Sequence, residues 1–126
     1  MTTVKFAVPC VEKSLESQVS PHFGHCALFA VLTGDKKEKK IVKAEFVENV
    51  AHEHGGCDAP VSLLAAKQIS AVLAAGIGMR PLSGFTERGI KVYYAGPTTV
   101  ESAANAFLEG KLELLGDQNV CSHSKW

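Results

Sequence analysis

The side chains best suited to bind a metal are five histidines and four cysteines, and they fall into groups along the chain. The groups are Cys10; His22, His25 and Cys26; His52, His54 and Cys57; and Cys121 with His123. The surrounding residues predict loops, strand ends or a chain terminus at these positions, whereas free cysteines are usually buried in core segments. Imidazole and thiolate groups ligate zinc and iron–sulfur clusters. The grouping therefore indicates a metal or metal–sulfur site, although the place of Cys26 beside an apolar run favours core packing for that residue.

Segment 52–57 carries the most information. It offers two imidazoles and one thiol as metal ligands, with two glycines that let backbone approach a bound group: His52, His54, Cys57, Gly55 and Gly56. The segment leads into a predicted helix, whose positive amino end would stabilise an anionic cluster. Its spacing is not a standard zinc pattern, so a polar, glycine-rich connector is the alternative interpretation.

Two further segments could contribute to binding. His22, Gly24 and His25 lie in a turn-forming sequence, where hydrogen-bonded loop histidines are an equally good interpretation. Cys121 and His123 lie in the last eleven residues, in a tail that could close over a metal or take no part.

Gly76 and Gly78 follow a predicted strand, and backbone N–H groups there could help to hold an anion. A dinucleotide site is not indicated, because Pro81 replaces the third glycine of the G-x-G-x-x-G pattern. A tight turn from strand to helix is the favoured interpretation.

Apolar periodicity predicts the elements that position these residues. Strands are expected at 4–8, 27–32, 41–48, 71–75 and 90–95, and helices at 58–69, 80–88 and 98–109, the last with Thr98 and Glu101 as a capping box. Strands 27–32 and 41–48 should form an antiparallel pair, joined by a solvated charged turn at 36–40. Right-handed crossovers then predict a three-layer α/β domain with a mixed, mostly parallel five-stranded sheet flanked by helices. In such folds ligands bind beyond the carboxyl ends of the strands, which would gather Cys10 and the Gly76 to Gly78 turn.

Composition limits the remaining possibilities. The 126 residues are 46% hydrophobic and 21% charged, which predicts one globular domain over 1–115 and a tail over 116–126. Thirteen basic residues balance thirteen acidic ones, so neither nucleic acid nor a membrane surface is an expected partner. The amino-terminal residues do not resemble a signal peptide, so we expect a cytoplasmic protein with reduced thiols.

The order of the motifs resembles the dinitrogenase iron-molybdenum cofactor biosynthesis family, which includes NifX-like proteins and the carboxyl-terminal domain of NifB. The resemblance covers nearly the whole chain. It depends on the segments 4–8, 20–25 (Ser-Pro-His-Phe-Gly-His), 48–56, 71–80 and 89–93.

The resemblance implies a ribonuclease H-like fold. It also implies non-catalytic carrying or sensing of an iron- and/or molybdenum-containing metal–sulfur cluster, in cofactor assembly or related metal homeostasis. Cofactor-assembly or target proteins would then be partners. Two alternatives stay open: a small zinc-binding or interaction module, and a metal-dependent nuclease, which the absence of acidic residues from segment 4–8 disfavours.

Overall fold

The computed structural model describes residues 3–20, 23, 28–48 and 58–115. The elements follow in the order β1 (Thr3–Cys10), β2 (Leu28–Asp35), β3 (Lys40–Glu48), α1 (Asp58–Ala65), β4 (Ala71–Ala74), α2 (Met79–Glu87), β5 (Lys91–Tyr94), α3 (Val100–Leu108) and β6 (Glu113–Leu115). Every predicted strand and helix is present. No helix in the described part of the chain is long and apolar enough to cross a membrane.

The strands form a single sheet in the order β3-β2-β1-β4-β5-β6. β1 pairs parallel with β4 and β4 with β5, while the other three neighbouring pairs are antiparallel. The prediction of a mixed sheet is therefore confirmed, but the prediction of a mostly parallel, five-stranded sheet is wrong. The sixth strand, β6, is only three residues long, and no strand was predicted there, at the end of the predicted domain.

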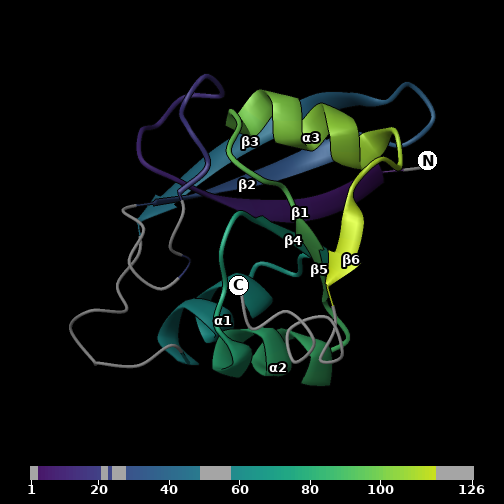
Figure 1. Cartoon of the computed structure of the whole chain (residues 1–126). Helices are drawn as coiled ribbons and strands as arrows, with labels where there is room; N and C mark the ends of the chain where they lie inside the picture. Colours follow the sequence, from purple (N-terminus) through teal and green to yellow (C-terminus); the bar gives the residue numbers. More distant parts are fainter. Residues whose placement is uncertain (1–2, 21–22, 24–27, 49–57, 116–126) are drawn as a thin grey trace.

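Helices cover both faces of the sheet, which makes three layers (Figure 1). α1 and α2 bury one face, where Ala7 of β1 and Val72 of β4 point. α3 buries part of the other face, where Phe6 and Val8 of β1 point. Because successive residues of a strand point to opposite faces, β1 must be apolar at almost every position to satisfy both layers.

The helix ends differ slightly from the predicted ones. α3 is capped by Thr99, whose side chain accepts a hydrogen bond from the Ser102 N–H, rather than by the predicted pair of Thr98 and Glu101. Gly110 follows the helix with φ of 76°, a conformation that favours glycine.

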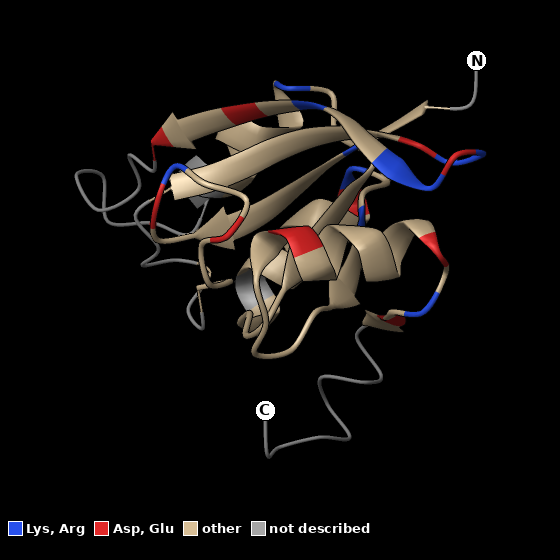
Figure 2. Cartoon of the chain, turned by 90° about the horizontal axis from the view of Figure 1, so that it is seen from above, with Lys and Arg blue, Asp and Glu red and all other residues tan. Residues whose placement is uncertain are grey.

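β3 lies at one edge of the sheet, and most of its side chains are exposed. Four of its nine residues are charged, namely Lys40, Lys43, Glu45 and Glu48, and charged residues fill the turn that precedes it (Figure 2). Charges on an edge strand hinder pairing with another chain.

Candidate functional site

The carboxyl ends of β1 and β4 lie side by side, because these strands run parallel with Phe6 opposite Ala71 and Ala7 opposite Val72. β1 therefore ends at Cys10 on the same side of the sheet where β4 leads into Gly76 and Gly78 (Figure 1). We call this side the carboxyl edge.

The same edge holds the ends of two more strands. Cys10 is opposite Leu28, where β2 begins, and Leu28 is opposite Glu48, where β3 ends. The three residues form one row across the sheet. Segment 21–27 therefore joins the sheet at this row, and segment 49–57 leaves from it.

Two backbone hydrogen bonds hold Ser20 and Phe23, two residues of the Ser20 to His25 motif, at the carboxyl edge. The Ser20 N–H donates to the Pro9 carbonyl of β1 at 2.9 Å, and the Phe23 N–H donates to the Gly76 carbonyl after β4 at 3.1 Å. These bonds bracket Pro21 and His22 in the sequence.

The Phe23 ring strengthens this attachment. It is 1% exposed, and its centroid lies 5.3 Å from the ring of Phe29 and 5.4 Å from that of Phe85, so Phe23 is anchored in the core beneath the edge. Sequence reasoning singled out His22, Gly24 and His25 in this motif and missed the anchor. An aromatic residue in an otherwise polar turn was the available signal.

The segment after β1 folds around a buried hydroxyl. Ser17 is 3% exposed, and its Oγ accepts hydrogen bonds from the N–H groups of Val11 and Glu12 at 3.0 and 3.1 Å and donates to the Gln18 carbonyl. The Ser17 carbonyl accepts from the N–H of Val100, the first residue of α3. Ser17 thus connects the two elements: its side chain holds the segment after β1, and its backbone carbonyl holds the start of α3.

The Cys10 thiol is buried in the core on the α3 face of the sheet. Burial raises its pKa to about 11, against hydrogen bonds with the backbone of Ala30 and Glu12 that lower it. The thiol is therefore protonated at neutral pH, which favours packing over ligation. Its predicted part in cofactor binding stays a prediction, and ligation would require the thiol to lose its proton.

The turn after β4 leads into the amino end of α2. Gly78 is the N-cap, with no side-chain cap and with φ of −79°, and a Cβ there would meet only Pro81 Cδ, at 3.8 Å. Neither space nor backbone conformation therefore requires glycine at this position. In this turn, the Gly76 carbonyl accepts the hydrogen bond that holds Phe23.

Most of the predicted ligands lie outside the described residues: His22, Gly24, His25, His52, His54, Gly55, Gly56, Cys57, Cys121 and His123. Their roles stay predictions. Within residues 3–20, 23, 28–48 and 58–115, no group of three or more His, Cys, Asp or Glu side chains could hold a metal ion.

Known proteins resemble this chain along most of its length. Residues 4–110 match the family described as dinitrogenase iron-molybdenum cofactor. An uncharacterised protein of Methanocaldococcus jannaschii is 36% identical over 99 residues, which cover 77% of this chain and 82% of that protein.

Solved structures share the fold. The apo form of the orange protein from Desulfovibrio gigas superposes with a TM-score of 0.77 at 28% identity, covering 89% of this chain and 92% of that one. A Thermotoga structure described as a NifB protein has a TM-score of 0.74 at 33% identity, covering 89% and 93%.

Proposed function

The chain belongs to the dinitrogenase iron-molybdenum cofactor family, and from that membership we propose that it binds and carries an iron- and/or molybdenum-containing metal–sulfur cluster at the carboxyl edge. The cluster is cargo, delivered or sensed in cofactor assembly or related metal homeostasis, and assembly or target proteins are the partners. We also propose that the fold is of the ribonuclease H-like class and that the protein works in the cytoplasm.

The observation that supports the proposal is the attachment of Ser20 and Phe23 at this edge, through their hydrogen bonds to the Pro9 and Gly76 carbonyls, because His22 lies between these two residues in the sequence. The row of Cys10, Leu28 and Glu48 adds that the two histidine-containing segments, 21–27 and 49–57, are both tied to this side of the sheet. Two segments that are far apart in the sequence and that carry ligand-type residues therefore join the sheet at the same edge.

The described residues alone do not form a ligand set. We therefore assign ligation to His52, His54 and Cys57, with His22 and His25 as further ligands and the Cys121 and His123 pair as a lid. Thiolate is the soft ligand that such metals prefer, which makes Cys57 the most important of these residues. Cys10 supports the edge from within the core.

We propose binding without turnover. A nuclease of similar fold would need carboxylates clustered on its central strands. The parallel strands β1, β4 and β5 contain no Asp or Glu, so the middle of this sheet offers no general base and no oxygen ligands for a pair of hard metal ions.

The test is anaerobic reconstitution with iron(II), sulfide and tetrathiomolybdate, followed by metal analysis and visible spectroscopy. We expect iron or molybdenum with charge-transfer absorption. Cys57→Ala should weaken uptake about tenfold, roughly 1.4 kcal/mol, and adding His54→Ala should weaken it further. Cys26→Ala removes a thiol that we assign to packing and is the matched control.

Thermal unfolding should be nearly the same for Cys57→Ala and the parent protein, because segment 52–57 is not expected to contribute core packing. Stoichiometric zinc without iron or molybdenum would support the zinc alternative instead. Equal uptake by the Cys57→Ala/His54→Ala protein would contradict the assignment of this segment.

A further inference from the structure

A cavity of about 440 Å³ lies at the opposite side of the sheet, where the parallel strands begin. Its floor is formed by Ala71 of β4 and by Lys91 and Tyr93 of β5, and its wall by Phe107 and Leu108 at the end of α3. It therefore lies at the other end of the parallel strands from the carboxyl edge. Pockets that bind small molecules commonly have volumes of about 300–1,000 Å³.

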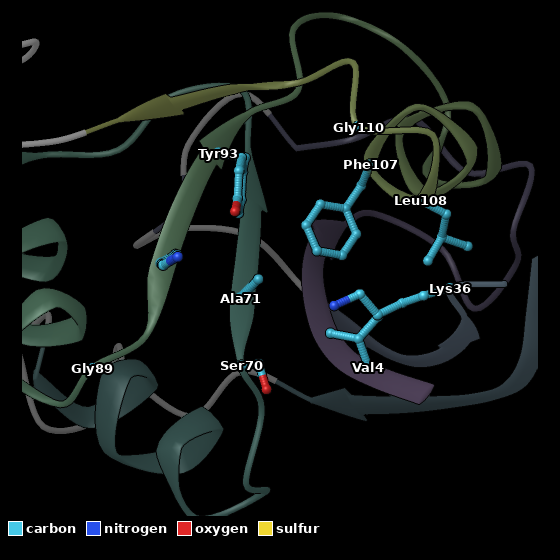
Figure 3. Close-up of a pocket in the computed structure, with 10 residues that line it drawn as sticks. Val4, Lys36, Ser70, Ala71, Gly89, Tyr93, Phe107, Leu108 and Gly110 are labelled. Atoms are coloured by element: carbon cyan, nitrogen blue, oxygen red, sulfur yellow. The ribbon is translucent and has the colours of Figure 1, made fainter. Parts of the chain in front are cut away.

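The cavity exists because α3 covers only part of its face of the sheet. Lys91 and Tyr93 alternate with Val92, which is buried on the face of α1 and α2, so both point to the α3 face. α3 packs against β2, β3 and β4 and contacts β1 through Phe107 and Phe6, and the space beside its last turn next to β5 stays open (Figure 3).

The wall of the cavity is aromatic and held in place. The Phe107 ring lies 4.8 Å from the ring of Phe6 and 5.1 Å from that of Tyr93, measured between centroids. Phe6 is fully buried, while Phe107 and Tyr93 are only partly buried. A fixed ring with one open side is suited to stacking against a flat group.

Two lysines border this wall. Lys91 comes from the start of β5 and Lys36 from the turn between β2 and β3, and the Lys36 side chain extends into the cavity between Val4 and Phe107 (Figure 3). Among the described residues neither lysine forms an ion pair. Segment 36–40 was predicted to be a solvated turn, and Lys36 is indeed exposed in that turn, but it also lines the cavity.

Nearby negative charge is already matched by other groups. Glu109, which follows α3, forms an ion pair with Lys111 at 2.8 Å, and this lysine holds the pKa of that carboxyl below its usual value. Three carbonyls of the last turn of α3 accept N–H groups from Glu109, Gly110 and Lys111. The negative charge at the carboxyl end of α3 is therefore partly compensated, so Lys36 and Lys91 carry the main charge of the cavity.

We propose that this cavity binds a small organic anion with a flat aromatic group, the ring against Phe107 and Tyr93 and the anionic group between Lys36 and Lys91. The site is separate from the carboxyl edge and does not depend on metal. Occupancy of this cavity would follow the concentration of the ligand, at a surface separate from the proposed cluster site.

The test is a titration of the full chain, followed by amide chemical shifts, with three probes: phenyl phosphate, inorganic phosphate and benzyl alcohol. Phenyl phosphate has both the ring and the charge, and each of the others has one of them. We expect phenyl phosphate to shift the amides of residues 70–71, 91–93 and 107–110 and to bind at least tenfold more tightly than either control.

Charge reversal supplies the matched variants. Lys36→Glu/Lys91→Glu should lose at least tenfold in phenyl phosphate affinity. Lys37→Glu/Lys43→Glu makes the same change of net charge at exposed lysines that do not line the cavity, and it should bind as the parent does. Circular dichroism confirms that both variants are folded.

Any one of the following results would overturn the proposal: no shifts with phenyl phosphate at millimolar concentrations, shifts centred on other residues, or equal losses of affinity in the two charge-reversed proteins. Equal binding of benzyl alcohol would show that the lysines add nothing and would equally contradict an anion site.

Discussion

Replacing Ser17 with alanine should destabilise the protein well beyond the usual effect of a small substitution. The hydroxyl makes three hydrogen bonds, two accepted from the N–H groups of Val11 and Glu12 and one donated to the Gln18 carbonyl. At about 1 kcal/mol for each net hydrogen bond, the loss would be about 3 kcal/mol. Val11, Glu12 and Gln18 are exposed, so water can replace part of this loss, and we expect about 2 kcal/mol.

Urea unfolding measures this free energy directly. In a chain of 126 residues the same loss should lower Tm by about 6–10 °C. The matched control is Ser14→Ala in the same segment, where the hydroxyl accepts one local, exposed bond from the Glu16 N–H, and we expect at most about 0.5 kcal/mol. Equal destabilisation by the two variants would refute the assignment of Ser17 as the centre of this segment.

Three further predictions concern single sites. Thr99→Ala should lower the free energy of unfolding by about 1 kcal/mol, because it removes the α3 cap. Thr98→Ala should lower it much less. The opposite ranking in urea unfolding would support Thr98, the cap predicted from the sequence. Gly34→Ala should lower stability by about 1–3 kcal/mol, since the new Cβ would lie 2.7 Å from Leu108 Cδ2, and an unchanged Tm would show that this side chain moves aside freely. Because folding raises the pKa of Cys10 from 9.0 to about 11, the folded state holds the proton more tightly, so stability should fall as pH rises from about 9 to about 11. The slope should be clearly smaller in Cys10→Ala, and an unchanged slope would contradict this assignment.

Most of the fold could be predicted because its buried strands are continuous apolar runs. β1 and β4 are covered on both faces, so their sequences carry a strong signal. β6 has only three residues, two of them exposed, and β5 supplies its pairing partner. Such a strand depends on tertiary pairing more than on its own sequence, so no local pattern predicts it.

The direction of pairing was harder to predict than the strands themselves. The βαβ unit from β4 to β5 fixes its own parallel pairing through the crossover, and β2 and β3 form a hairpin. The antiparallel pairing of β1 with β2 depends on how residues 11–27 return the chain, and the hydrogen bonds of Ser17 and Ser20 that direct part of this return leave no periodic signal.

The sequence predicts where the site lies in the fold but not which way its side chains point. The position of Cys10 beside the turn after β4 followed from the rule for carboxyl ends of parallel strands. That rule says nothing about side-chain direction, and a strand residue one position earlier or later would have pointed to the opposite face. Cys10 points into the core with Val8, which is why its thiol is buried.

The two ends of the parallel strands offer different chemistry for a physical reason. At the carboxyl edge, β1, β3 and β4 end and β2 begins, so segments 21–27 and 49–57 join the sheet there, and we propose that they hold a soft metal cargo. At the opposite end the connections near the cavity are short turns, so a site there depends on what the helices leave uncovered. α3 leaves an aromatic wall beside two lysines, which suits an organic anion. The buried strands between these ends are packed on both faces and have little freedom to move, so each site can be altered by surface substitutions without disturbing the other.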